Sequence, residues 1–218
     1  MARGVIFDCD GVLADSEKLS CGAWLPALAR HGVASTLEEV ERFLGRSDRE
    51  VLEHMRRVHR ADLPESLVDE RLEDYYALAR GRLRPFPGAR EALLELQRLG
   101  FALAVASSGR PEKIAFSLGE VGLADLLPVV CSATGVARGK PAPDLFLLAA
   151  ARLGLAPGRC AVVEDSVVGI AAARAARMHP VGFPSGTTAE ALAEAGAECV
   201  VEDFGSLPGR AEALLGPC

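Results

Sequence analysis

The chain has 218 residues, of which 50% are hydrophobic and 25% are charged, a composition typical of a soluble globular protein with a sizeable core. Its formal net charge is −6 and it has no arginine-rich run or basic tail, which argues against nucleic acid as a partner. An acidic protein that binds an anionic substrate needs a metal ion or a local positive site.

The sequence predicts a cytoplasmic protein that does not enter membranes. The N-terminus leads at once into Val5-Ile6-Phe7, which is too short for a signal peptide, and the longest apolar runs are far below the length of a membrane-spanning helix. The 6 cysteines form no CxxC pair and have no histidine at zinc-ligand spacing. We therefore expect reduced thiols that pack as small hydrophobic side chains.

Short apolar runs alternate with segments of helical periodicity along most of the chain. Strands are expected at residues 3–7, 101–106, 127–131, 160–163, 180–183 and 198–201. Helices are expected between them at 89–99, 111–118, 143–153, 167–176 and 189–195. This alternation predicts an α/β fold in which a Rossmann-like parallel sheet carries helices on both faces.

Residues 15–84 interrupt the alternation. They contain helical patterns at 17–30, 48–59 and 64–80 and no convincing strand, and they end in the turn-rich stretch Arg84-Pro85-Phe86-Pro87-Gly88. We therefore predict a catalytic core formed by residues 1–14 and 85–218, with a small all-helical cap domain (15–84) inserted after the first strand. Such a cap could close over a small ligand at the edge of the sheet.

Polar side chains of complementary chemistry follow four of the predicted strands, where an open α/β sheet binds its ligands. They are Asp8 and Asp10, then Ser107, then Lys140 some residues beyond the third strand, then Glu164 and Asp165. Carboxylates gathered at one edge repel one another unless a cation neutralises them. Oxygen ligands of this kind are typical of Mg²⁺, which often shares its coordination shell with a substrate phosphate.

This set of residues matches the requirements of phosphoryl transfer. Asp8 is the candidate nucleophile, because a carboxylate can form an acyl phosphate, and Asp10 is the candidate acid and base for the leaving alcohol and the attacking water. Ser107 and Lys140 would bind the phosphoryl oxygens, and Lys140 would also pair with Asp8. The candidate metal ligands are Asp8, Asp10, Glu164 and Asp165.

Four segments carry a resemblance to a known family. They are Val5-Ile6-Phe7-Asp8-Cys9-Asp10-Gly11-Val12-Leu13-Ala14-Asp15-Ser16-Glu17, Val105-Ala106-Ser107-Ser108, Gly139-Lys140-Pro141-Ala142-Pro143-Asp144 and Val163-Glu164-Asp165-Ser166. Together they resemble the haloacid dehalogenase superfamily, specifically its phosphatases with a helical cap, in the β-phosphoglucomutase and phosphoglycolate phosphatase group. The resemblance implies a modified Rossmann core, Mg²⁺ as cofactor, and the backbone carbonyl of Asp10 as a metal ligand.

Departures from the family patterns narrow the activity. The superfamily's dehalogenases lack an aspartate at the place of Asp10, which points to chemistry on phosphate esters. Mutases similar to β-phosphoglucomutase carry a histidine at the place of Ser20, so hydrolysis ranks above mutase activity. The implied substrate is a small phosphorylated metabolite, such as a sugar phosphate or phosphoglycolate.

The cap offers candidates for recognising the leaving group. Arg46 lies where relatives place substrate-contacting residues and could bind a second anionic group, with a solvated surface arginine as the alternative. Ser108, Arg110 and Glu17 complete the candidate substrate-binding set.

Two other classes of protein remain as alternatives. A phospho-signalling receiver also accepts a phosphoryl group on an aspartate, but it would be a compact domain without an insert of this size, and we would not expect its lysine to precede the Glu164-Asp165 pair. A non-catalytic binding protein could use the same fold, but it would have no need of the complete catalytic set.

Overall fold

A computed structural model describes residues 2–43 and 47–216, and the chain divides into two compact units. The first unit, here called the core, comprises Met1–Asp15 and Arg84–Cys218, and the second, here called the cap, comprises Ser16–Leu83. These boundaries differ by one residue at each junction from those expected. Among the described residues, no helix combines the length and apolar character that crossing a lipid bilayer requires.

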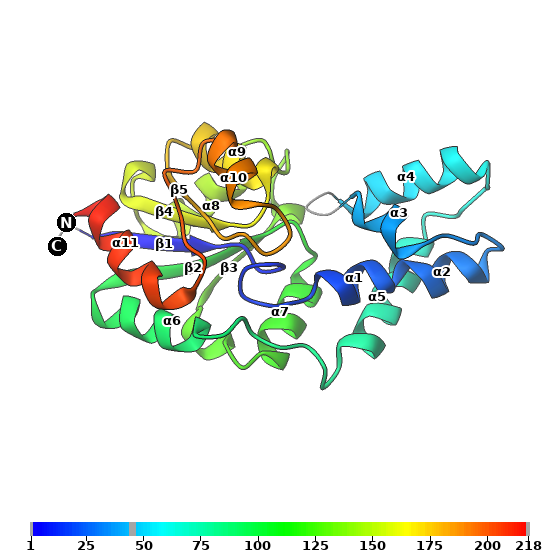
Figure 1. Ribbon diagram of the computed structural model, residues 1–218, viewed down its shortest axis with the longest axis horizontal. Coiled ribbons are helices and arrows are strands. Elements are labelled where there is room, and N and C mark those ends of the chain that lie inside the picture. Colours follow the sequence, from blue (N-terminus) through cyan, green and yellow to red (C-terminus); the bar gives the residue numbers. More distant parts are fainter. Residues whose placement is uncertain (1, 44–46, 217–218) are drawn as a thin grey trace. The chain divides into compact units, whose positions relative to one another are not determined.

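Within the described residues, the core contains one sheet of six parallel strands in the order β3-β2-β1-β4-β5-β6 (Figure 1). The strands are β1 (Arg3–Phe7), β2 (Phe101–Ser107), β3 (Val129–Ser132), β4 (Cys160–Glu164), β5 (His179–Gly182) and β6 (Cys199–Val200). The order reverses between β1 and β4, which is where doubly wound sheets bind ligands. The predicted α/β fold class is confirmed.

The helices of the core cover both faces of the sheet (Figure 1). They are α6 (Ala89–Arg98), α7 (Pro111–Glu120), α8 (Asp144–Leu153), α9 (Val167–Ala175), α10 (Ala189–Ala195) and α11 (Leu207–Leu215). Right-handed crossovers place helices on opposite faces as the chain winds outwards from β1 in the two directions. Burial on both faces explains why the central strands are almost wholly apolar.

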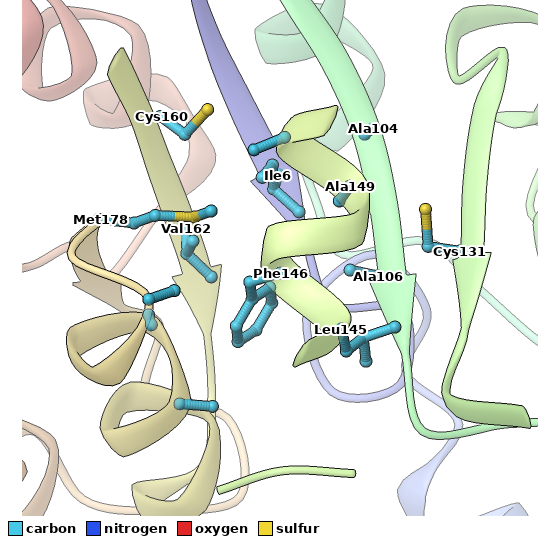
Figure 2. Packing of buried hydrophobic residues seen from close by; sticks show 14 residues of the cluster. Ile6, Ala104, Ala106, Cys131, Leu145, Phe146, Ala149, Cys160, Val162 and Met178 are labelled. Carbon is cyan, nitrogen blue, oxygen red and sulfur yellow. The ribbon is translucent and has the colours of Figure 1, made fainter. Parts of the chain in front are cut away.

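A cluster of small and branched side chains fills the space between the sheet and helices α8 and α9 (Figure 2). Ile6, Ala104 and Val162 from three neighbouring strands lie against Phe146 and Ala149 of α8. All of these side chains are fully buried. This packing fixes the strands whose ends carry the polar residues.

The cap is helical in the part of the chain that is described. Its helices are α1 (Glu17–Gly22), α2 (Trp24–Arg30), α3 (Leu37–Glu41), α4 (Asp48–His59) and α5 (Leu67–Ala79). The single helix expected at 17–30 is two helices that meet at Ala23. Pro26 explains the break, because its ring lacks an N–H and clashes with the carbonyl four residues earlier, at Gly22.

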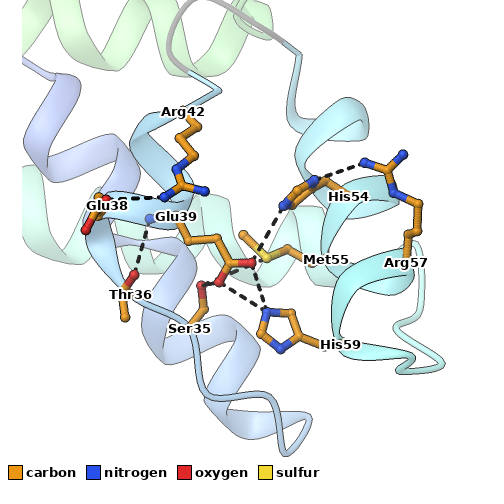
Figure 3. Close-up of polar contacts among 9 residues, drawn as sticks. All are labelled: Ser35, Thr36, Glu38, Glu39, Arg42, His54, Met55, Arg57 and His59. Atoms are coloured by element: carbon orange, nitrogen blue, oxygen red, sulfur yellow. Dashed lines mark hydrogen bonds and ion pairs between the residues drawn. The ribbon is translucent and has the colours of Figure 1, made fainter.

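Polar contacts join α3 to α4 around Glu39 (Figure 3). Its carboxylate accepts a hydrogen bond from Ser35 Oγ at 2.7 Å and contacts His59 Nε2 at 3.1 Å and His54 Nε2 at 3.6 Å. The hydrophobic cap core lies beside it and includes Trp24, which is 2% exposed. The Glu39 side chain is 18% exposed, so its carboxylate gains from such partners, and the cluster links α3 to α4.

The two chain segments at which the cap leaves and re-enters the core lie side by side. Ala14 and Pro85 form an antiparallel bridge, the Asp15 N–H donates to the Arg84 carbonyl at 3.0 Å, and the Phe86 N–H donates to the Leu13 carbonyl at 3.3 Å. Backbone hydrogen bonds within the core therefore hold together the two segments that flank the insert.

Candidate active site

The loop that follows β1 carries Asp8 and Asp10. The Asp8 N–H donates to the Val163 carbonyl of β4 at 3.0 Å, and the Leu13 and Ala14 N–H groups both donate to the Cys9 carbonyl at 3.0 Å. These bonds fold residues 8–14 into a tight loop at the carboxyl end of the sheet. Asp8 is 6% exposed, so its carboxylate lies in a largely desolvated position.

Lys140 lies between two carboxylates. Its Nζ atom donates to Asp8 Oδ1 at 2.5 Å and also to Glu164 Oε1, and its side chain is 4% exposed. The other oxygen of Glu164 accepts a hydrogen bond from Ser166 Oγ at 2.9 Å. Ser166 caps α9 by accepting from the Gly169 N–H at 3.1 Å, so the start of this helix supports the pair.

Burial and charge perturb both members of the Asp8–Lys140 pair. Burial raises the pKa of Asp8 to about 7, against the attraction of Lys140 and with the added repulsion of Glu164 and Asp10. Burial also tends to lower the pKa of Lys140, but the charges of Asp8 and Glu164 prevail and hold it above its ordinary value. Negative charge is therefore in excess around Asp8.

Asp165 lies against the loop after β1. A Cβ atom on Gly11 would be 2.1 Å from Asp165 Oδ2, so only glycine leaves room for this carboxylate, and the φ angle of 79° at Gly11 also favours glycine. Ser185, in the segment after β5, donates to the Gly11 carbonyl at 2.5 Å and lies 3.4 Å from Asp165 Oδ2. No motif in the sequence marks Ser185 as a site residue.

The loop after β2 carries Ser107, which is 2% exposed. Its Oγ atom accepts a hydrogen bond from the Gly109 N–H at 3.1 Å, and Ser132 Oγ donates to the Gly109 carbonyl at 2.6 Å. Ser108 and Arg110 are exposed, and Arg110 occupies the N-cap position of α7. Two adjacent strands, β2 and β3, thus hold the turn that follows Ser107.

Lys113 joins the site although its sequence position did not predict it. Its Nζ atom donates to Asp10 Oδ2 at 2.7 Å. One feature of the sequence could have drawn attention to Lys113: the chain contains only three lysines among 24 basic residues, so each lysine stands out where arginine is the usual choice.

The charges at this edge fit a divalent cation. Lys140 pairs with Asp8 and Glu164, Lys113 pairs with Asp10, and the carboxylate of Asp165 lies beside Gly11, so the site holds four carboxyl groups and two ammonium groups. Among the described residues, no three His, Cys, Asp or Glu side chains form a metal cage on their own. The arrangement suits Mg²⁺, which completes its shell with carbonyl oxygen, water and phosphate.

Two candidate residues belong to the other part of the chain. Glu17 begins α1 of the cap and is half-buried. Arg46 lies outside the described residues.

The chain matches a model of a known protein family. Residues 2–177 match the family described as haloacid dehalogenase-like hydrolase. The match covers the strands and loops that carry all four motifs.

Three relatives show how far the similarity extends. The chain is 32% identical over 209 residues to the protein SUPPRESSOR OF QUENCHING 1, chloroplastic, of Arabidopsis thaliana, covering 93% of this chain but only 20% of that longer protein. It is 34% identical over 201 residues to validoxylamine A 7′-phosphate phosphatase of Streptomyces hygroscopicus subsp. limoneus, covering 89% of this chain and 92% of the relative. It is 32% identical over 194 residues to β-phosphoglucomutase of Bacillus subtilis, covering 84% of each chain.

The same similarity holds in three dimensions. The crystal structure of a HAD family hydrolase from Deinococcus radiodurans R1 with bound phosphate and sodium superposes with a TM-score of 0.76 at 32% identity, covering 100% of this chain and 99% of the other. With the family model matched across most of the chain, the chain belongs to the haloacid dehalogenase-like hydrolases.

Proposed function

We propose that the protein is a Mg²⁺-dependent phosphatase that hydrolyses the phosphomonoester of a small sugar or sugar-like metabolite through an aspartyl-phosphate on Asp8. The observation that carries the proposal is the buried Asp8 carboxylate held by Lys140 at the switch point of the sheet. The relatives named for a phosphatase and a phosphoglucomutase support the substrate class.

In the first step, a carboxylate oxygen of Asp8 attacks phosphorus as the bond from phosphorus to the leaving oxygen breaks, and Asp10 gives that oxygen its proton. In the second step, Asp10 takes a proton from water, which attacks the aspartyl-phosphate and releases inorganic phosphate. Ser107 and Lys140 stabilise the charge on the phosphoryl oxygens throughout.

Mg²⁺, when bound, would supply positive charge to the phosphoryl group. We assign its ligands to Asp8, Asp165 and the Asp10 carbonyl. Both oxygens of Glu164 already accept hydrogen bonds, from Lys140 and Ser166, so in this proposal Glu164 orients Lys140. Ser185 supports the metal site from outside by contacting Asp165 and Gly11.

Hydrolysis is favoured over a mutase reaction by the residue at position 20. Ser20 Oγ accepts a hydrogen bond from Arg71 within the cap, so a side chain that does not act as a base near neutral pH stands where mutases of this group have histidine. A serine there would not return the phosphoryl group to a sugar hydroxyl by base catalysis, and water would take its place.

Recognition of the leaving group is assigned to the cap, with Arg46 as the leading candidate. Arg46→Ala should lower kcat/KM on a substrate with a second anionic group by roughly 10–150-fold, the value of a charged contact. The loss on p-nitrophenyl phosphate, which has no such group, should be small. Equal losses on both substrates would remove Arg46 from this role.

The proposed function is tested by phosphate release from p-nitrophenyl phosphate and from a panel of phosphorylated sugars and sugar alcohols, with and without Mg²⁺. We expect turnover that requires Mg²⁺ and is abolished in Asp8→Asn, since an amide cannot accept the phosphoryl group. The matched control is Asp62→Asn, which alters an exposed aspartate of the cap. Mg²⁺-dependent turnover by pure Asp8→Asn would rule out the covalent mechanism, and transfer to sugar hydroxyls instead of water would identify a mutase.

The expectation of a cytoplasmic location is part of the same proposal. All five cysteines in the described part of the chain are free thiols, which suits a reducing compartment.

A further inference from the structure

Lys113 belongs to the first turn of α7, and its side chain is directed into the site. Its side chain is 9% exposed, whereas that of its partner Asp10 is 26% exposed. The ammonium group is therefore largely withdrawn from water, and the carboxylate remains accessible to a ligand.

The place of Lys113 in its helix is unfavourable for a lysine. The N-terminus of a helix carries partial positive charge and favours acidic side chains such as the neighbouring Glu112. Burying an ammonium group also has a desolvation cost that only a well-placed carboxylate offsets. Both effects oppose Lys113 at this position, and its pairing with Asp10 offsets them.

The stem of Lys113 lies beside the turn that follows Ser107. Its Cδ atom lies 3.6 Å from the position that a Cβ atom on Gly109 would take, and Gly109 donates its N–H to Ser107 Oγ. One side chain therefore runs alongside the loop after β2 and binds a carboxylate on the loop after β1.

We propose that Lys113 is a positioning residue that fixes the side chain of Asp10 for proton transfer to the leaving oxygen. The inference rests on the proposed phosphatase function and adds a residue to the same site. A partly exposed carboxylate on a loop can adopt several rotamers, and a hydrogen bond of 2.7 Å to Oδ2 restricts it to one. Restricting a catalytic group to the productive geometry contributes directly to rate.

The test compares two aryl phosphates that differ mainly in the basicity of the leaving group. Nitrophenolate leaves p-nitrophenyl phosphate readily without a proton, whereas phenolate leaving phenyl phosphate is more basic and depends on an acid. The value of kcat/KM reports the steps up to release of the phenol, so it isolates the proton transfer to the leaving group.

Lys113→Met keeps an apolar stem and removes the ammonium group. We expect it to lower kcat/KM by about 10–100-fold on phenyl phosphate, a large part of what general acid catalysis contributes, and by less than about 3-fold on p-nitrophenyl phosphate. Lys113→Arg should restore most of the loss. Glu112→Gln, which changes the exposed neighbour in the same helical turn, should leave both substrates unaffected.

A double substitution tests the path of the effect. If Lys113 acts through Asp10, Lys113→Met in the Asp10→Asn background should change kcat/KM on phenyl phosphate by less than about 2-fold, because the two residues act as one unit. Independent losses that multiply would overturn the proposal.

Equal losses on the two substrates would show that Lys113 binds the phosphoryl group instead, and unchanged kinetics would show that the pair is structural only. If Lys113→Met does not fold, Lys113→Gln is the second variant, because it retains most of the stem and a weaker donor. It should show the same selective loss of kcat/KM on phenyl phosphate. Equal losses of kcat/KM on the two substrates in this variant would also overturn the inference. A wild-type protein without Mg²⁺-dependent turnover would instead refute the proposed function, before any variant is compared.

Discussion

A Cβ atom added to Gly169 would lie 1.9 Å from Cδ of Glu164, so the first turn of α9 packs directly against the carboxylate that binds Lys140 and leaves no room there for a side chain. Gly169→Ala should displace Glu164 and loosen Lys140. We expect kcat to fall by up to about 10²–10³-fold, the effect of losing one preorganised electrostatic contact. The free energy of unfolding should fall by about 1–3 kcal/mol because of overpacking, as measured by urea denaturation.

Gly119 is the matched control for this substitution. It lies in helix α7, and a Cβ atom there would meet nothing within 4 Å. Gly119→Ala should therefore retain full activity and stabilise the protein by about 0.5–1 kcal/mol, because alanine loses less backbone entropy in a helix. Equal activity in the two variants would show that Gly169 has no part in placing Glu164.

Asp10→Asn should slow turnover by about 10²–10⁴-fold, the usual contribution of general acid–base catalysis. The second step also lacks its base in this variant, so phospho-enzyme should accumulate and be detectable by acid quenching and intact mass measurement. Asp15→Asn, which changes an exposed aspartate close by in the chain, serves as the control. Wild-type rates in Asp10→Asn would assign Asp10 a structural role.

Asp165→Ala should weaken the binding of Mg²⁺, since one of its proposed carboxylate ligands is lost. The measurement is the Mg²⁺ concentration that gives half-maximal activity. Ser185→Ala should raise it by about 10-fold, in the range found for residues that support metal ligands, and Asp165→Ala should raise it further. An unaltered half-saturation concentration in Asp165→Ala would exclude this residue as a ligand.

Glu39 should make the stability of the cap depend on pH. Burial alone would raise the pKa of Glu39, but hydrogen bonds from Ser35 and His59 and the charges of His59 and His54 outweigh it and hold the pKa below its ordinary value. A carboxyl group whose pKa is lower in the folded state stabilises that state above its unfolded pKa of about 4.3. This stabilisation is lost as the pH falls through the lower, folded-state pKa.

Glu39→Gln should therefore destabilise the cap by about 1 kcal/mol near pH 6, and the difference from wild type should disappear in strongly acidic solution. Amide hydrogen exchange in α4 measures the effect locally. Glu38→Gln is the control, because the Glu38 side chain is 83% exposed and pairs only across one helical turn with Arg42. A difference that stays constant with pH would contradict the role given to the Glu39 charge.

The sequence alone was sufficient to predict the sheet and the four motif-bearing loops, because a buried parallel strand is a short apolar run that ends abruptly in polar residues. Asp8, Ser107 and Glu164 could be placed at one edge for this reason. Helix α11 was not among the expected helices, because Pro208 and Gly209 weaken the helical pattern at its start, although proline is tolerated in the first turn of a helix.

Contacts between distant segments were beyond the reach of sequence patterns. Lys113 has the spacing of an ordinary helical lysine, and only the folded chain brings it 2.7 Å from Asp10. Ser185 stands in a loop with no motif, and its contact with Gly11 depends on the position of β5 in the sheet. Pro26 could have predicted the break between α1 and α2, because its local effect on a helix is known.

The bridge between Ala14 and Pro85 has an evolutionary consequence. Residues 16–83 connect two segments of the core that are already hydrogen-bonded to each other. An insert with adjacent ends can be exchanged without moving the residues that flank it. Under the proposed function, the hydrolytic machinery and the choice of leaving group can then diversify separately. A chimaera that replaces residues 16–83 with the insert of a relative would inherit the donor's substrate range on an unaltered catalytic edge.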